Sequence, residues 1–139
     1  MIKILLASHG DLADGIYSSL KIIMGSQNNI NTLCAYKEEE FDLNKEVSNI
    51  ISKLSDEDKL IIVTDIYGGS VNNEFMNYLN KDNIHLISGL NLPLIMELLS
   101  IKDEDNIKDM INTAIENSKD TIKYCNEIAK IAALEEDCF

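Results

Sequence analysis

Apolar residues in this chain fall into short continuous runs and into longer segments with helical spacing. Residues 2–7 and 60–63 are aliphatic and nearly uninterrupted, which is the pattern of strands buried on both faces of a parallel sheet. Residues 29–36 and 84–88 are weaker strand candidates, and each follows Asn-rich turn material. The pattern therefore predicts four strands.

Between and after these strands, apolar side chains recur every three or four positions, as they do on the buried face of a helix. The predicted helices cover residues 11–24, 41–54, 71–79, 92–99 and a last, long segment from about 104 towards 134. Gly25 is a plausible stop for the first helix, and the acidic run of residues 38–40 suits the start of the second. We expect the tail, residues 135–139, to be frayed.

Strands that alternate with helices at this spacing predict right-handed βαβ crossovers. The fold class is therefore α/β, with a doubly wound, mainly parallel sheet of four to five strands and helices on both faces, a flavodoxin-like three-layer sandwich. No linker, repeat or low-complexity segment divides it, so we expect a single domain over residues 1–134. In such folds ligands bind at the carboxyl ends of the strands.

Composition narrows the possible functions. Twelve Lys and Arg against 24 Asp and Glu give a formal net charge of -12, so most of the surface would repel nucleic acid, and we expect no such partner. Cys34, Cys125 and Cys138 lack the spacing of a disulfide framework or a zinc site. Because no apolar run approaches the ~20 residues that span a bilayer and the N-terminus lacks signal-peptide features, we expect a cytoplasmic protein.

Two polar residues at strand ends are the main candidates for chemistry. His9 follows the first predicted strand, and Asp65 follows the third. If these strands are neighbours, the Asp65 carboxylate can accept the Nδ1 hydrogen of His9, fix the ring's tautomer and leave Nε2 as a nucleophile. A lone histidine is more often structural, so the interpretation depends on this pairing. His85 lies inside a predicted strand, and we interpret it as structural.

The turn after Asp65 could bind an anion. Gly68 and Gly69 permit close backbone approach, and Ser70 could cap the next helix while its hydroxyl and nearby amides face a phosphate. The alternative is an ordinary strand-to-helix turn with a serine cap, which the triplet alone would favour. Metal binding is not expected, because His9 and Asp65 lack an evident third and fourth ligand.

Three segments resemble the signature segments of mannose-family enzyme IIA (EIIA) domains of the bacterial sugar phosphotransferase system (PTS). They are Ala-Ser-His-Gly at 7–10, Thr-Asp-Ile-Tyr-Gly-Gly-Ser-Val-Asn-Asn at 64–73 and Ser-Gly-Leu-Asn-Leu-Pro-Leu at 88–94. Their order and spacing also match, and the resemblance covers residues 1 to about 100. Val71 departs from the family, which usually has proline there.

The resemblance implies that His9 is phosphorylated and that Asp65 is its hydrogen-bonded partner. It also implies that Ser70, with Gly68, Gly69 and Gly10, contacts the phosphoryl group. The expected donor is the histidine phosphocarrier protein (HPr), and the expected acceptor is a IIB component that serves membrane IIC and IID subunits. A homodimer is implied as well, and no cofactor is expected.

Three alternatives remain open at this stage. The chain could be the IIA-like phosphotransfer subunit of a dihydroxyacetone kinase, which also uses a histidine. It could be a receiver-like signalling domain phosphorylated on Asp65, although such domains need an acidic pair after the first strand, where this chain has Ser8 and His9. It could also be a flavodoxin-like module that binds a mononucleotide.

Overall fold

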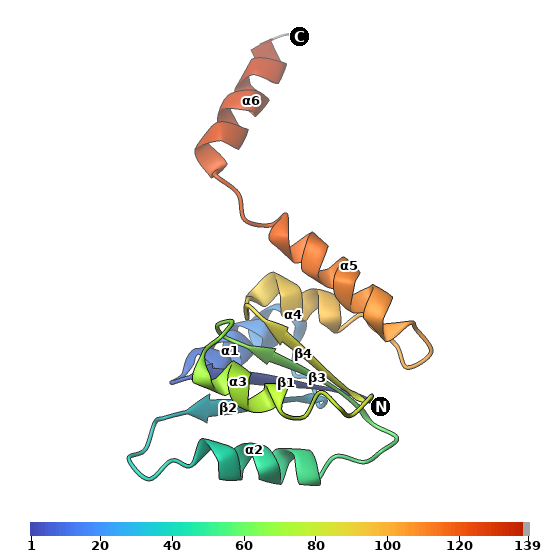
Figure 1. Cartoon of the computed structure of the whole chain (residues 1–139). Coiled ribbons are helices and arrows are strands. Elements are labelled where there is room, and N and C mark those ends of the chain that lie inside the picture. Colours follow the sequence, from blue (N-terminus) through green and yellow to red (C-terminus); the bar gives the residue numbers. More distant parts are fainter. Residues whose placement is uncertain (138–139) are drawn as a thin grey trace.

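Four parallel strands form the centre of the molecule. The computed structural model describes residues 1–137, so Cys138 and Phe139 lie outside it. The strands are β1 (Ile2–His9), β2 (Ile30–Ala35), β3 (Lys59–Thr64) and β4 (Ile84–Ser88). Their order in the sheet is β2-β1-β3-β4, and every neighbouring pair is parallel (Figure 1). The predicted α/β class and parallel sheet are confirmed.

Side chains of the central strands alternate between two hydrophobic cores. Ile4 and Leu6 of β1 point to one core, and Leu5 and Ala7 point to the other. All four are at most 3% exposed, so the sheet is covered on both faces. This double burial is why the strand sequences read as uninterrupted aliphatic runs.

Helices on the two faces supply the other half of each core. On one face lie α1 (Leu12–Met24) and α4 (Leu92–Leu98), with α5 (Ile107–Lys119) packed beside α4. On the other lie α2 (Leu43–Ser52) and α3 (Ser70–Met76). Figure 1 shows α4 and α5 above the strands and α2 below them. The helices on both faces are the doubly wound arrangement predicted from the sequence.

The C-terminal prediction of one long helix is wrong. The structure divides this segment into α5 and a separate α6 (Cys125–Asp137), and α6 projects away from the sheet (Figure 1). At the break, the Thr121 hydroxyl donates to the Ser118 carbonyl at 2.6 Å, so a side chain takes an acceptor at the end of α5. The buried face of α5 also ends at Ser118, and residues 121–136 are exposed. Part of the predicted frayed tail is helical, because α6 continues to Asp137.

Several element boundaries differ from the predictions by two or three residues. β1 continues to His9, so the histidine is the last residue of the strand rather than part of the following turn. The N-cap of α2 is Asp42, whose carboxylate accepts from the backbone N–H of Lys45 at 3.2 Å, and the acidic run at 38–40 precedes it.

Among the described residues, no helix combines the length and apolar character needed to span a membrane.

Candidate active site

His9 and Asp65 meet at the carboxyl edge of the sheet. His9 ends β1, and Asp65 directly follows β3, which pairs with β1 so that Ala7 lies opposite Thr64. The chain crosses from β1 to β2 on one side and from β3 to β4 on the other. The two residues therefore lie where strand order reverses, the usual place for a ligand in a doubly wound sheet.

The Asp65 carboxylate accepts hydrogen bonds from two parts of His9. Oδ2 accepts from the backbone N–H of His9 at 2.8 Å and lies 2.8 Å from ring Nδ1, while Oδ1 accepts from the N–H of Ile66 at 2.9 Å. Burial opposes ionisation of Asp65. The donors on His9 and Ile66 outweigh it, so the pKa of Asp65 lies below its ordinary 3.8. The carboxylate is therefore ionised at neutral pH.

This contact determines which ring nitrogen of His9 is free. An ionised carboxylate can only accept, so Nδ1 carries the hydrogen and Nε2 carries the lone pair in the neutral ring. The His9 side chain is 44% exposed, whereas that of Asp65 is only 12% exposed. The arrangement presents a nucleophilic nitrogen to the solvent and holds the ring from its buried side.

The glycine turn brings backbone close to the imidazole. Gly68 has φ 79°, a conformation that L side chains rarely adopt. A Cβ on Gly69 would lie 2.6 Å from Cγ2 of Ile66 and 3.4 Å from ring Cε1 of His9. Glycine is needed at both positions, and Gly10 lies at the same edge, donating its N–H to the Ala35 carbonyl at 2.8 Å.

Ser70 lies beside His9 and does not cap the next helix. It is the first residue of α3, and the N-cap, Gly69, offers no side chain. Ser70 Oγ lies 3.3 Å from Nε2 of His9 and 2.8 Å from the hydroxyl of Tyr36. The cap expected at Ser70 is therefore wrong, while its expected place beside the histidine agrees with the structure.

Tyr36 was missed as a candidate, because the sequence placed it only at the end of a strand. It follows β2 with φ 64°, the only positive φ among non-glycine residues in the described chain. Its ring centroid lies 5.5 Å from that of His9. An aromatic residue after a strand at the carboxyl edge was the available signal, but a sequence does not show a left-handed backbone at a tyrosine.

Buried hydrogen bonds fix the loops that carry the site. The Thr64 hydroxyl donates to Oδ1 of Asn72 at 2.7 Å, which connects β3 to α3 beneath the glycine turn. The Thr64 carbonyl accepts from the N–H groups of Gly89 and Leu90, each at 2.9 Å. Ser8 Oγ accepts from the N–H of Ala13 at 2.8 Å at the start of α1. These bonds give the exposed residues a rigid base.

His85 lies in the middle of β4, apart from this edge. Its partner in β3 is Ile61, and Ile61 pairs with Ile4, five positions before His9. Burial lowers the pKa of His85, and the charges of Lys108 and Lys59 lower it further. These surroundings favour the neutral ring, which suits a structural position.

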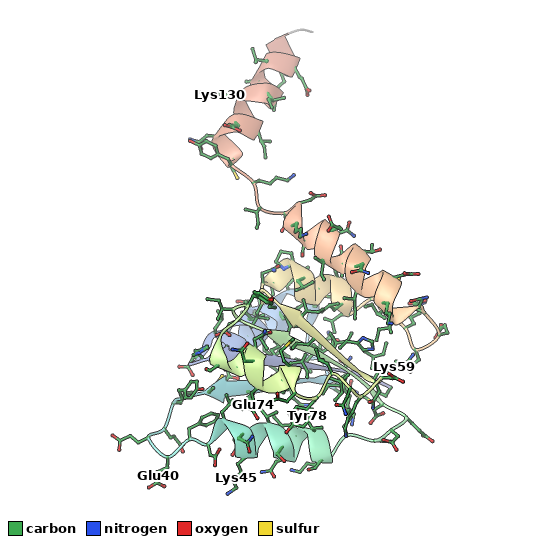
Figure 2. The ribbon with its side chains drawn as sticks, viewed as in Figure 1. Glu40, Lys45, Lys59, Glu74, Tyr78 and Lys130 are labelled. Atoms are coloured by element: carbon green, nitrogen blue, oxygen red, sulfur yellow. The ribbon has the colours of Figure 1, made fainter. Side chains whose placement is uncertain are left out.

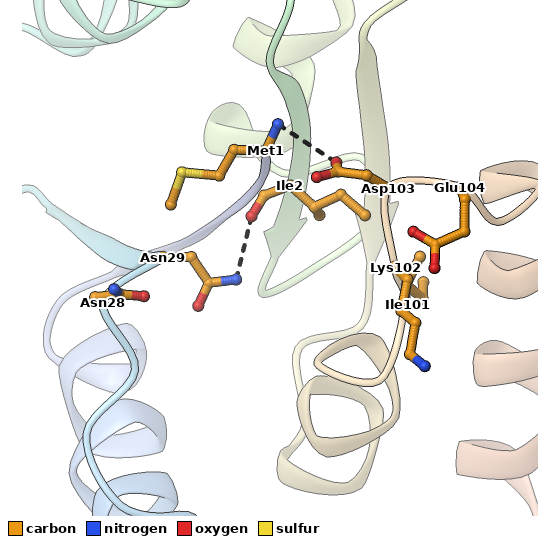
Figure 3. A pocket seen from close by; sticks show the side chains of 8 residues that line it. All are labelled: Met1, Ile2, Asn28, Asn29, Ile101, Lys102, Asp103 and Glu104. Atoms are coloured by element: carbon orange, nitrogen blue, oxygen red, sulfur yellow. Dashed lines mark hydrogen bonds and ion pairs between the residues drawn. The ribbon is translucent and has the colours of Figure 1, made fainter.

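A hollow at the opposite end of the sheet is separate from His9. Figure 3 shows it beside the N-terminus, where Met1 forms an ion pair with Asp103 at 3.3 Å and Asn29 donates to the carbonyl of Ile2 at 3.1 Å. Met1, Ile2 and Asn29 lie at the amino ends of β1 and β2, and Asp103 lies between α4 and α5, whereas the candidate site is at the carboxyl ends of the strands. The hollow therefore plays no part in the chemistry of His9.

Comparison with known families identifies the family of the chain. The family model described as "PTS system fructose IIA component" matches residues 3–115 of the chain. The chain belongs to the mannose family of PTS EIIA domains. It is thus a phosphotransfer subunit of a sugar PTS, and the resemblance seen in the three sequence segments is confirmed.

Curated relatives of this EIIA domain carry matching names. The fructose-specific EIIA component of Bacillus subtilis is 25% identical over 140 residues, which cover 99% of this chain and 96% of the relative. The mannose-specific EIIAB component of Escherichia coli K12 is 24% identical over 125 residues. That match covers 88% of this chain but 39% of the longer relative.

Solved structures share the fold of this EIIA domain. A Klebsiella pneumoniae protein, described as a candidate permease of the phosphoenolpyruvate-dependent sugar PTS, is 46% identical with a TM-score of 0.88, covering 92% of this chain and 93% of that one. EIIA from Streptococcus agalactiae is 27% identical with a TM-score of 0.75, covering 91% of this chain and 99% of that one. Both similarities extend through most of the chain.

Proposed function

We propose that the chain carries a phosphoryl group on Nε2 of His9, accepting it from HPr and passing it to a IIB component. The observation that carries this proposal is the contact of Asp65 Oδ2 with both the backbone N–H and Nδ1 of His9, each at 2.8 Å. It leaves Nε2 exposed and unprotonated in the neutral ring. Family membership supplies the reaction class, and the site supplies the acceptor atom.

Both proposed transfers balance without a further reactant. The lone pair of His9 Nε2 forms a bond to phosphorus while the N–P bond of the donor breaks, and the donor nitrogen keeps that electron pair. The His9 ring then carries a positive charge, since Nδ1 keeps its hydrogen, and the Asp65 carboxylate offsets this charge. In the second transfer the His9 N–P bond breaks in the same way.

Four residues beside His9 are proposed contacts of the phosphoryl group. Ser70 Oγ lies 3.3 Å from Nε2, so a phosphoryl oxygen on this nitrogen would lie within reach of the hydroxyl. Gly68, Gly69 and Gly10 form the adjoining backbone, and a Cβ on Gly69 would lie 3.4 Å from ring Cε1 of His9. Such shallow, polar surroundings suit a group that must stay attached and then leave.

The proposed partners follow from family membership. The name of the Escherichia coli relative joins EIIA and IIB in one component, which supports IIB as the acceptor. The membrane IIC and IID subunits would then be served indirectly, from the cytoplasmic side. A kinase-associated EIIA is less well supported, because the named relatives are components of sugar PTS transporters.

The chemical lability of the label tests this function against phosphorylation of Asp65. The chain incubated with HPr that is already phosphorylated should gain one phosphoryl group without added magnesium, as intact-mass spectrometry would show. A phosphoramidate on His9 should survive alkali and be lost in mild acid. Label that requires magnesium and is cleaved by alkali or neutral hydroxylamine would instead indicate an acyl phosphate on Asp65 and contradict the proposal.

We also propose that the chain forms a homodimer through α6. Three apolar side chains share one face of this helix by their spacing, and Ile128, Ile131 and Leu134 are 47%, 57% and 65% exposed. The helix stands clear of the sheet (Figure 2), and residues 121–136 are exposed in the described structure. An apolar face of this kind is typically covered by a partner.

Light scattering coupled to size-exclusion chromatography tests the dimer. Wild type should elute as a dimer, and Ile131→Glu should elute as a monomer because it places a charge in the apolar face. Asn126→Glu adds the same charge on the opposite side of α6 and should remain dimeric. A monomeric wild type, or a dimeric Ile131→Glu variant, would contradict the role of α6.

A further inference from the structure

Tyr36 occupies a strained position beside the candidate nucleophile. Its φ of 64° is a left-handed conformation that places Cβ close to the following carbonyl oxygen. Such outliers persist where surrounding contacts hold them, and they gather at functional sites. The strained backbone therefore indicates that contacts of the Tyr36 side chain hold it in place.

The Tyr36 side chain contacts both Ser70 and the His9 ring. Its hydroxyl lies 2.8 Å from Ser70 Oγ, and its ring centroid lies 5.5 Å from that of His9 with the planes tilted by 36°. The Tyr36 ring also meets the Phe41 ring nearly edge-on, with centroids 5.4 Å apart. Phe41 therefore packs against the tyrosine that contacts the site.

The hydrogen-bond chain from Tyr36 to His9 has a definite direction in the neutral ring. Because Nδ1 donates to Asp65, Nε2 can only accept, so the Ser70 hydroxyl donates to it across 3.3 Å. Ser70 Oγ then accepts from the Tyr36 hydroxyl. The tyrosine thereby fixes the direction in which the serine hydrogen points.

Phosphorylation of Nε2 removes the lone pair that Ser70 addresses. The serine hydrogen then becomes available to a phosphoryl oxygen, while Tyr36 continues to hold Ser70 Oγ. The His9 ring also gains a positive charge at a distance where aromatic faces attract cations, within about 6 Å of the centroid. Tyr36 can therefore contact Ser70 through its hydroxyl and the His9 ring through its aromatic face both before and after phosphorylation.

We propose that Tyr36 is a positioning residue for phosphoryl carriage, orienting Ser70 through its hydroxyl and supporting the His9 ring through its aromatic face. The inference rests on the proposed function of His9. It adds the residue that follows β2 to a site at the carboxyl ends of β1 and β3. In this role the Tyr36 hydroxyl acts through Ser70.

The test compares Tyr36→Phe with Tyr67→Phe. The first removes the hydroxyl and keeps the ring, whereas Tyr67 is 82% exposed and its hydroxyl bonds to no described residue. With phosphorylated HPr as donor, Tyr36→Phe should slow labelling of His9 and shorten the life of the label by about five- to tenfold, the loss of one hydrogen bond near a charged group. Tyr67→Phe should match wild type in both.

A double-mutant cycle isolates the action through Ser70. If Tyr36 orients Ser70, adding Tyr36→Phe to Ser70→Ala should change neither rate further. Independent, additive losses would overturn the proposal, and so would wild-type rates in Tyr36→Phe alone. Circular dichroism would confirm that each variant is folded.

A readout without phosphoryl transfer separates this inference from the function on which it rests. The ¹⁵N shift of His9 Nε2 in the unphosphorylated protein should move in Tyr36→Phe and in Ser70→Ala, and stay in place in Tyr67→Phe. An unmoved shift in Tyr36→Phe would overturn the contact. A wild type that takes no label would overturn phosphoryl carriage itself, and the Nε2 shift would still decide whether Tyr36 acts on His9.

Discussion

The variant His9→Ala is expected to take no phosphoryl group from phosphorylated HPr, whereas wild type takes one group per chain. The substitution removes the ring nitrogen Nε2 that is the proposed acceptor, and neither Ser70 nor Asp65 replaces it. The Ser70 hydroxyl lacks a base once the imidazole is gone, and the Asp65 carboxylate is only 12% exposed in the intact site. Intact-mass spectrometry after incubation measures the result.

The matched control for this experiment is His85→Gln. It removes the other histidine of the chain, which lies in β4 well below the carboxyl edge of the sheet. This variant should be labelled like wild type. Undiminished labelling of a folded His9→Ala variant would move the acceptor elsewhere, and loss of label in His85→Gln alone would do the same.

The variant Asp65→Asn is expected to remain folded and to transfer phosphoryl at least tenfold more slowly, about 1.4 kcal/mol of barrier. An asparagine has one oxygen where the structure needs two, because Oδ2 serves His9 and Oδ1 serves Ile66. Its NH₂ group would therefore face a donor. The neutral amide would also fail to stabilise the positive ring that phosphorylation creates.

Rapid-quench measurement of transfer from phosphorylated HPr gives the rate, with Asp11→Asn as control. Asp11 is an exposed carboxylate two residues from His9 that pairs with Lys37 at 2.6 Å rather than with the histidine. Asp11→Asn removes a nearby negative charge that does not contact His9. Its transfer rate therefore shows whether the slowing in Asp65→Asn comes from the lost contact with His9 or only from the lost charge. Equal rates for wild type and Asp65→Asn would reduce Asp65 to a turn residue.

The sheet and the pairing of His9 with Asp65 were predictable from the sequence because both follow from short-range patterns. Aliphatic runs gave the central strands, and parallel strands bring their carboxyl ends to one edge. Two polar residues at the ends of such strands lie near each other when the strands are neighbours. The prediction needed only that β1 and β3 be neighbours, which the structure confirms.

Features that depend on competition between local contacts were not predictable. The segment after Ser118 has helical spacing, yet the Thr121 hydroxyl takes a backbone acceptor there and no core lies beyond to reward continuation. Tyr36 has a left-handed backbone, and its side chain contacts Ser70 and His9, which lie far from it in the sequence. The spacing of apolar residues predicts neither the helix break nor the backbone conformation of Tyr36.

The two bonds that Asp65 Oδ2 accepts from His9 determine when, during folding, the tautomer of the His9 ring becomes fixed. The two residues are 56 positions apart, and they meet only when β1 and β3 pair in the observed register. Before that pairing the imidazole of His9 is free to exchange its hydrogen between both nitrogens. In a chain that grows from its N-terminus, His9 is made early, but its ring is held in one tautomer only after Asp65 has been added and β3 has paired with β1. The tautomer of His9 therefore reports whether these two central strands have paired.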